Sequence, residues 1–402
     1  MHSVTQSPAD PQFVQNPYAF YDRARVLGPV VHWAEYGMPA LLGHAEVTAA
    51  LRDRRLGRVP PGGLAPFPPH LAAFGRAESL SLLSLEGSDH ARLRALVLRA
   101  FTARRVAALA PEIEALCHAL IDGFPDAGAF DLMAQYATRV PVIVIARLLG
   151  VPETACEKLL DWSHAMVAMY RPGVGRDTEE AADRAARDFT AWLNGLMDRP
   201  GAEREESLLG TLLGAEAEGA LSRDESLACA ILLLNAGHEA TVHALGNAAR
   251  LLMEQGDAAV LTHPARVAAT VEECLRLVPP LHVFTRHVLH PVTIAGHDFA
   301  PGREVACLLG AANRDPAVFR APDSFGPGRT GPTLTSFGGG VHFCLGAPLA
   351  RLELQIALRV LFERCHDLRL AEVPALADIY HFHGHDRLMV ARDLPATART
   401  LD

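Results

Sequence analysis

The chain has 402 residues, and half of them are hydrophobic, which is enough to bury a large core. Its formal net charge of −9 provides no general attraction to nucleic acid or to an anionic membrane surface. The apolar run from Leu227 to Leu234 is too short to cross a bilayer, and residues 1–16 lack the apolar core of a signal peptide. We therefore expect a cytoplasmic protein that binds neither nucleic acid nor a membrane.

The seven cysteines are an odd number and form no C-x-x-C pair, which is typical of a reducing cytoplasm in which most thiols are inert. No proline-, glycine- or serine-rich linker, repeat or change of composition divides the chain. We predict a single domain over residues 1–402, although a chain of this length has room for two or three domains.

The first predicted elements are a helix over residues 17–28, a short hairpin over 29–43 and a second helix that begins at His44. The next segment, 59–84, is rich in proline and has no clear period. A long loop of this kind inside a compact chain is usually functional or mobile. The segment is therefore either a lid over a site or an ordinary surface excursion.

The helix that follows begins near Ser88 and carries two cationic donors. Ser88 or Asp89 can cap its first turn. His90 and Arg94 are four residues apart, so their side chains face the same way. Such a face suits an anion, and the alternative is a solvated basic surface.

The longest predicted helix begins at the capping box Ser222–Glu225 and runs to about Gln255, which gives a length of about 50 Å. Its centre contains Gly237 and Glu239, although buried glutamate is rare and glycine weakens a helix by about 1 kcal/mol relative to alanine. The centre is therefore a functional site or, alternatively, part of a helix with one wet face. Amphipathic helices precede it at 110–124, 129–150, 152–170, 178–198 and 205–215.

Glu273 and Arg276 share one face of the next predicted helix, which Pro279 ends. A lone pair of this kind is usually a surface contact worth less than about 1 kcal/mol. The chain as a whole reads as mainly α with a small β region. Its later strands are predicted at Val283–His287, Val292–Ile294 and Val305–Leu309.

The segment Phe337–Gly346 contains three consecutive glycines, followed by Cys344 at the start of a helical apolar pattern. Free backbone N–H groups and the helix dipole favour a thiolate at such a position. Cys344 is therefore a metal ligand or a nucleophile, for which His342 could act as the base. A phosphate-binding loop is disfavoured, because the Gly-Lys-Ser/Thr ending is missing.

The spacing F-G-x-G-x-H-x-C-x-G resembles the haem-binding loop of the cytochrome P-450 family, the haem-thiolate monooxygenases, in their soluble bacterial form. The resemblance covers about His90 to Val390. It implies one haem b, held between the long central helix and the cysteine loop, with Cys344 as the axial iron ligand. The loop residues that it places at the haem are Phe337, Gly338, His342, Cys344 and Gly346.

Other motifs take their roles from the same resemblance. His90, Arg94 and Arg286 match the residues that hold the haem propionates. Glu273, Arg276 and Arg329 match a structural triad that locks the fold around the haem loop. The histidines at 381, 383 and 385 would share one face of a strand and so fit a second metal site, but the family has a turn there, which we favour.

The segment from Ala236 to Thr241 resembles the oxygen-activation motif of the family, with one departure. Gly237 and Glu239 match the glycine and the acid. Ala240 stands where the family usually has a threonine, and Thr241 comes one residue later. Because a helix turns about 100° per residue, the hydroxyl of Thr241 cannot simply replace the missing one.

The resemblance implies activation of dioxygen and the hydroxylation, or a related oxidation, of a mostly apolar small molecule. No flavin or ferredoxin segment is visible, so we expect electrons from a separate ferredoxin and its NAD(P)H-dependent reductase. Two alternatives are a haem-thiolate sensor without turnover and a peroxide-driven oxidase without a redox partner. Glu239 argues against the peroxide-driven oxidase, in which we expect the distal acid to be missing.

Overall fold

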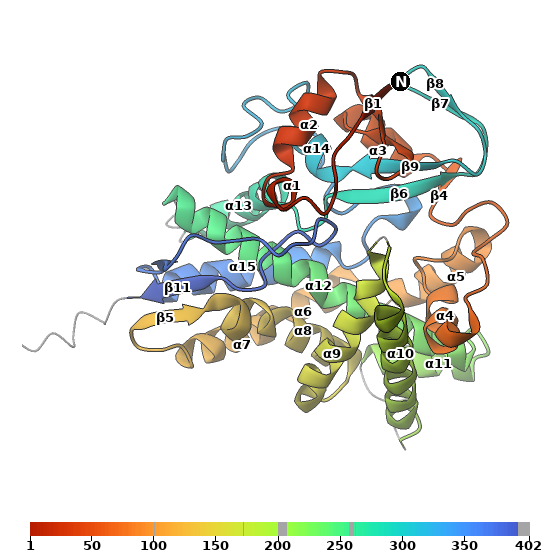
Figure 1. Ribbon diagram of the computed structural model, residues 1–402. Coiled ribbons are helices and arrows are strands. Elements are labelled where there is room, and N and C mark those ends of the chain that lie inside the picture. The colour runs from red at the N-terminus through yellow and green to blue at the C-terminus, as the bar shows by residue number, and fades with distance from the viewer. Residues whose placement is uncertain (100, 172, 200–206, 257–260, 262, 393–402) are drawn as a thin grey trace, which may run out of the picture. The chain divides into compact units, whose positions relative to one another are not determined.

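The computed structural model describes residues 1–402 except for 100, 172, 200–206, 257–260, 262 and 393–402. Helices dominate the described residues and the strands are few and short, which confirms the predicted mainly α fold with a small β region (Figure 1). Within the described residues, no helix is both long enough and apolar enough to span a membrane.

The chain folds into two compact units, each built from separate segments. The first consists of Met1–Leu56, Ala107–Val140 and Ala240–Asp402, and the second of Gly57–Val106 and Pro141–Glu239. The boundary falls inside the long helix α12, Arg223–Gln255, between Glu239 and Ala240. A single functional domain over the whole chain stays a prediction.

The first unit contains a six-stranded sheet ordered β1-β2-β3-β9-β6-β4. The predicted hairpin is present, because Val30 pairs with Leu41 and Trp33 with Met38. Fully buried Trp33 of β2 packs against Phe13 and Phe20 from the N-terminal helices, so an aromatic core forms between the sheet and these helices. The strands are β1 (His2–Val4), β2 (Val30–Trp33), β3 (Met38–Leu41), β4 (Leu56–Gly57), β6 (Val283–Val288) and β9 (Glu304–Leu308), with β7 (Val292–Ile294) and β8 (His297–Phe299) as a separate pair.

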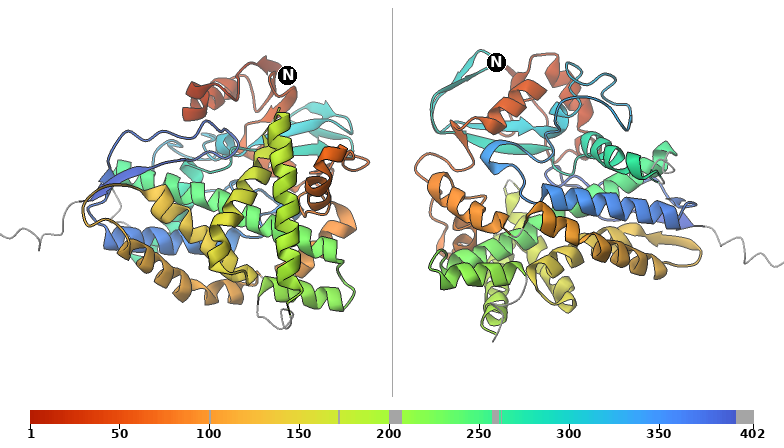
Figure 2. Two further views of the ribbon diagram at one scale, coloured as in Figure 1. Left: turned by 60° about the horizontal axis from the view of Figure 1, so that its bottom comes forward. Right: turned by 180° about the vertical axis from the view of Figure 1, so that it is seen from behind.

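Helix α15, Ala347–Arg364, is the helical centre of the first unit and packs against α7, Ala110–Asp122, and α13, Pro264–Leu277 (Figure 2). Tyr136, in the short helical segment Met133–Ala137, also contacts α15 by donating its hydroxyl to the carbonyl of Ala357 at 2.8 Å. Remaining elements of this unit are α1 (Pro11–Gln15), α2 (Tyr18–Arg25), α3 (His44–Arg52), α14 (Leu309–Ala312), and a small sheet of β10 (Arg369–Leu370), β11 (Met389–Arg392) and β5 (Gly128–Asp131).

The segment 379–388 forms bends with one isolated bridge, between Leu281 and Phe382, which agrees with the favoured turn and not with the alternative of a strand that carries its histidines on one face. His383 and His385 point to different backbone carbonyls, those of Val14 and Ala375, each at 2.7 Å. Burial lowers the pKa of both histidines to about 4. They are neutral core residues in this structure and do not converge on a metal.

In the second unit, α9, Cys156–Val167, and α10, Arg176–Met197, lie side by side and appear in yellow-green in Figure 2. Trp162 stacks on Phe189 between them, with ring centroids 5.0 Å apart. The unit also contains α4 (Ala72–Ser79), α5 (Gly87–Leu98), α11 (Leu208–Ala217) and most of α8 (Arg139–Leu149).

The proline-rich segment 59–84 is not a continuous loop, because it contains α4. The carboxylate of Asp183, on α10, accepts hydrogen bonds from the backbone N–H groups of Ala73 and Phe74, at 2.7 and 3.1 Å. These are first-turn donors that have no partner within their own helix. Because Asp183 caps α4 from a distant part of the chain, the residues just before α4 need not contain a capping side chain, and the sequence did not predict the start of this helix.

Candidate active site

Two glycines of the loop Phe337–Gly346 have a backbone conformation that residues with a side chain rarely adopt. Gly338 and Gly340 have φ angles of +71° and +68°, which are strained for any residue with a side chain. A Cβ on Gly340 would also collide with the backbone carbonyl of Leu51. The N–H of Cys344 donates to the carbonyl of Phe337 at 3.0 Å and closes the loop.

Phe337 is held by an arginine from the helix after the loop. The guanidinium of Arg351 lies 4.4 Å from the centre of the Phe337 ring, and its Nε donates to Glu272 Oε1 at 2.6 Å. Cation–π contact and ion pair together join the loop, α15 and α13. His342 ends a short 3-10 helix, Gly340–His342, and Gly346 caps α15.

Cys344 differs from the other six cysteines in being exposed. Burial raises the pKa of the Cys117 and Cys307 thiols to about 11 and that of Cys229 to about 12, so these thiols stay protonated at neutral pH. Cys344 is thus the cysteine that can offer its sulfur to a bound group. It lies three residues before Ala347, the first residue of α15.

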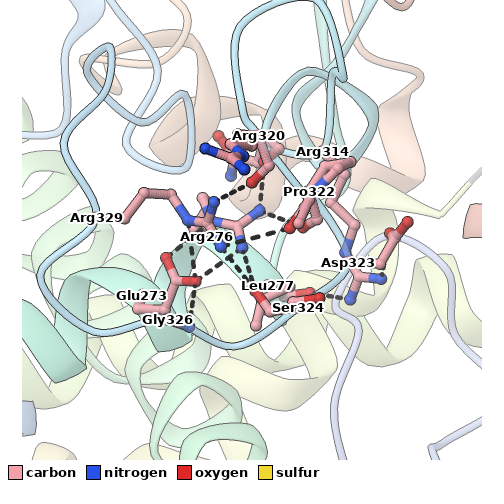
Figure 3. Close-up of polar contacts among 12 residues, drawn as sticks. Glu273, Arg276, Leu277, Arg314, Arg320, Pro322, Asp323, Ser324, Gly326 and Arg329 are labelled. Atoms are coloured by element: carbon pink, nitrogen blue, oxygen red, sulfur yellow. Dashed lines mark hydrogen bonds and ion pairs between the residues drawn. The ribbon is translucent and has the colours of Figure 1, made fainter.

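Glu273, on α13, is the centre of a buried polar cluster (Figure 3). Its two oxygens accept hydrogen bonds from Nη2 and Nε of Arg276, both at 2.8 Å. Arg329 Nε and the N–H of Gly326 also donate to Oε1, at 3.3 and 2.9 Å. Glu273 and Arg276 retain only 4% and 1% of their exposure. The three predicted triad residues are therefore in contact, and their pairing is not a surface one.

Asn313 connects this cluster to the cysteine loop. Its backbone carbonyl accepts a hydrogen bond from Arg276 Nη1 at 3.1 Å. Its side-chain Nδ2 donates to Ser336 Oγ at 2.7 Å, and its Oδ1 accepts from the N–H of Thr335 at 2.9 Å. All three of these polar residues are buried.

Ser336 completes the connection by donating its hydroxyl to the carbonyl of Leu275, in α13, at 2.8 Å. The residue directly before Phe337 is thereby fixed to the helix that carries Glu273. Sequence reasoning missed Asn313, Thr335 and Ser336 as site residues. The one available signal was a Thr-Ser pair directly before the glycine loop.

Arg286 lies on β6 of the first unit, at 2% exposure. Its Nη1 donates to the carbonyl of Thr285 at 2.8 Å. A buried guanidinium is costly unless anionic or carbonyl groups surround it.

His90 and Arg94 lie on α5 of the second unit. His90 is 4% exposed and Arg94 is partly exposed, so a wholly solvated basic face is wrong for this helix. The two side chains are one helical turn apart, as predicted.

The centre of α12 buries its polar residues and exposes its small ones. Asn235, His238, Glu239 and Thr241 are between 1% and 7% exposed, so the polar residues of this segment do not form a wet face. The more accessible positions here are 236, 237 and 240, which are alanine, glycine and alanine. They lie on one face of the helix.

Gly237 has a packing role of its own. A Cβ at this position would lie 2.7 Å from Cγ1 and 2.8 Å from Cδ1 of Ile145, on α8. The glycine therefore permits the close approach of α8 to α12. This explains a helix-weakening residue at the centre of the helix without a bound group.

Glu239 faces α9. Its Oε1 lies 3.4 Å from Ser163 Oγ, 3.4 Å from His164 Nε2 and 3.4 Å from Nε2 of its neighbour His238. Sequence reasoning missed Ser163 and His164, which are about 75 positions earlier in the chain and belong to a different helix. No local pattern signals a contact of that range.

Comparison with known proteins agrees with this geometry. The family model for cytochrome P450 matches residues 266–372, which include Glu273 and Cys344. The 6-deoxyerythronolide B hydroxylase of Saccharopolyspora erythraea is 36% identical over 88% of this chain and 89% of its own. The vitamin D(3) 25-hydroxylase of Pseudonocardia autotrophica is 35% identical over 89% of each chain.

Solved structures give the same result for the fold. P450BioI in complex with hexadec-9Z-enoic acid ligated acyl carrier protein has a TM-score of 0.89 and 30% identity, covering 95% of this chain and 100% of its own. The myxobacterial CYP267B1 in complex with myristic acid has a TM-score of 0.86 and 30% identity, covering 96% and 98%. The chain therefore belongs to the cytochrome P450 family of haem-binding monooxygenases.

Proposed function

We propose that this P450 uses dioxygen to hydroxylate a mostly apolar small molecule, with electrons from a separate ferredoxin and its NAD(P)H-dependent reductase. The observation that carries the proposal is Cys344, the exposed cysteine on a glycine loop that is tied to a buried ion pair. Relatives named as hydroxylases support the reaction class.

We propose haem b as the cofactor, because the residues named for it have the chemistry to hold it. Cys344 offers an accessible soft sulfur for the iron, and the positive φ angles of Gly338 and Gly340 shape the loop that carries it. Arg286, His90 and Arg94 supply cationic or N–H donors for two propionates. When bound, a thiolate-ligated haem of this kind supplies the activation and cleavage of dioxygen.

The accessible small residues of α12, at 236, 237 and 240, would contribute to holding the haem. Glu239 comes next to them and is 7% exposed, which suits a buried acid that delivers protons. Ala240 provides no hydroxyl. We infer that an ordered water, or a hydroxyl of the substrate, completes the path from Glu239.

The substrate is proposed to be apolar. Leu232 and Leu233 on α12 and Met166 and Val167 on α9 are buried apolar residues on the two helices that also carry the Glu239 cluster. Solved relatives that hold myristic acid and a carrier-bound hexadecenoic acid support long apolar chains as first compounds to examine. A screen of free and carrier-bound fatty acids for a shift of the Soret band tests this directly.

The test of the activity is product formed per dioxygen and per NAD(P)H consumed, with ferredoxin and reductase present. A monooxygenase gives close to one product for each, whereas a sensor binds the ligand without product. A peroxide-driven oxidase forms product from hydrogen peroxide alone, at a rate that the redox partners do not raise.

The ligand assignment has its own test, in the spectrum of the reduced protein with carbon monoxide. Cys344→Ala should lose the absorption band typical of thiolate-ligated haem. Cys274→Ala and Cys365→Ala should keep it, because both thiols are buried. A normal band from the Cys344→Ala protein would contradict the assignment.

A further inference from the structure

Three metal-ligand side chains meet in the second unit, between α9 and α12. They are His164, His238 and Glu239, and one ligand atom of each lies within 4.8 Å of the other two. It is the one such group of three found among the described residues. Two imidazoles and a carboxylate are the donor set of many protein zinc sites.

The separations match a tetrahedral ion. Zinc binds imidazole nitrogen and carboxylate oxygen at about 2.0–2.2 Å, so neighbouring ligand atoms on a tetrahedron are about 3.3–3.5 Å apart. Glu239 Oε1 is 3.4 Å from His164 Nε2 and 3.4 Å from His238 Nε2. Two edges of the tetrahedron are therefore already at the required length.

His238 is in the tautomer that a metal requires. Its Nδ1 lies 2.7 Å from the carbonyl oxygen of Leu234, and because a carbonyl can only accept, Nδ1 carries the proton. In the neutral ring Nε2 then presents a lone pair. Such a bond from the second nitrogen to a backbone carbonyl is the usual support of a metal-binding histidine.

The Nε2 atom of His238 is otherwise unsatisfied. The residue is 1% exposed, and Nε2 makes no hydrogen bond to any described residue even though Glu239 Oε1 is 3.4 Å away. A protonated Nε2 would donate to that carboxylate, whereas a lone pair beside a carboxylate oxygen is unfavourable without a cation between them. The buried nitrogen thus points to a cation at this place.

We propose that His164, His238 and Glu239 bind a divalent ion of the zinc class. Two nitrogen donors favour zinc over magnesium or calcium, which prefer oxygen ligands throughout. The His164 side chain is 59% exposed and provides an entry path from solvent. Three protein ligands leave a fourth position for water.

The ion would act on the proposed catalytic cycle, and this consequence rests on the proposed function. A zinc ion bound to Glu239 prevents its carboxylate from delivering protons. The same ion also links α9, through His164, to α12. Zinc is therefore a reversible inhibitor that lowers the product formed per NAD(P)H. The binding site itself does not depend on that cycle.

Binding is measured on the tag-free, haem-loaded protein by equilibrium dialysis against zinc, with the metal counted by mass spectrometry. His164→Gln is the clean variant, because its side chain is mostly exposed and its loss does not disturb the core. His238→Gln removes the buried ligand. His290→Gln is the matched control, an exposed histidine of the first unit.

We expect one zinc ion per chain in the unmodified and His290→Gln proteins, with affinity reduced on the order of a hundredfold by either ligand substitution. X-ray absorption at the zinc edge should show two imidazole ligands. If His238 is instead a charged partner of Glu239, zinc does not bind there or binds equally to the His238→Gln protein. Either result overturns the site.

The inhibition is tested separately from the binding. Zinc should lower coupling in the unmodified and His290→Gln proteins, and should leave the His164→Gln protein at its own zinc-free level. Zinc that binds as expected but leaves coupling unchanged would overturn the role of Glu239 in proton delivery. Absence of product without any zinc would overturn the proposed function instead.

Discussion

Arg276 donates a hydrogen bond to the backbone carbonyl of Asn313 at 3.1 Å, and the side chain of the same asparagine holds Ser336 at 2.7 Å. The buried ion pair of α13 and the start of the cysteine loop are therefore joined through one residue. A substitution in the ion pair should therefore destabilise the start of the cysteine loop, and a substitution at the start of the loop should destabilise the ion pair.

Asn313→Ala should loosen the cysteine loop without touching Cys344. It removes the acceptor of the Thr335 N–H and the donor to Ser336 Oγ, at a cost of about 2–3 kcal/mol, while Ser336 keeps its bond to the Leu275 carbonyl. Haem content after purification, and the unfolding midpoint in urea, should both fall. Asn16→Ala, at an exposed asparagine, is the control and should change neither.

Glu273→Ala should be far more damaging than Glu272→Ala, although the two residues are adjacent. Breaking a buried ion pair costs about 3–5 kcal/mol, because it leaves Arg276 as an uncompensated buried charge. Glu272 pairs with Arg351 at 38% exposure, so its loss costs less than about 1 kcal/mol. The yield of haem-loaded protein and its denaturant midpoint measure the difference, and equal effects would contradict the structural role of Glu273.

Three substitutions on α12 test the proton path. Glu239→Gln should severely reduce product formed per NAD(P)H, because the amide cannot deliver a proton. Thr241→Ala should have the milder effect, and Ala240→Thr should leave coupling similar or better with a substrate that lacks a hydroxyl. If Thr241→Ala uncouples as strongly as Glu239→Gln, then Thr241 is the proton donor.

Glu353, on α15, should make stability depend on pH. Burial raises the pKa of its carboxyl well above the usual range, and its Oε2 has no hydrogen-bond partner among the described residues. The folded chain keeps this proton at a pH where the unfolded chain, with a carboxyl pKa near 4.5, has lost it. The stabilisation is thus complete below about pH 4.5 and is lost as the pH rises toward the folded-state value.

Glu353→Gln removes this dependence, so the variant should gain stability relative to the unmodified protein between pH 5 and pH 8. Urea unfolding at the two pH values measures the gain. Glu363→Gln, on the exposed face of the same helix, should show no such change with pH. An equal shift in both variants would mean that Glu353 titrates normally.

Local patterns in the sequence predicted the elements that carry the site. The capping box of α12 is present, since Glu225 Oε2 accepts from the N–H of Ser222 at 2.8 Å and Ser222 Oγ accepts in return. The glycine loop, the strand β6 and the pairing of Glu273 with Arg276 are also as predicted. Each of these depends on residues that are close in sequence.

What the sequence could not show are contacts between distant segments. Asp183 caps α4 from about 110 positions away, and His164 meets Glu239 from another helix. The histidines at 383 and 385 have the alternation of a strand, but their ring nitrogens are committed to the carbonyls of Val14 and Ala375. Tertiary hydrogen bonds decided each of these cases, and periodicity does not encode them.

Because Cys344 is exposed and the other six cysteines are buried, bound haem should protect the chain from reagents that modify thiols. A thiol-alkylating reagent should modify a haem-free chain once, at Cys344, because the other thiols are buried and, for several, harder to deprotonate. A chain whose Cys344 sulfur is bound to iron should resist the reagent. The mass of the alkylated protein therefore counts empty and filled chains in one sample, independently of any absorption spectrum.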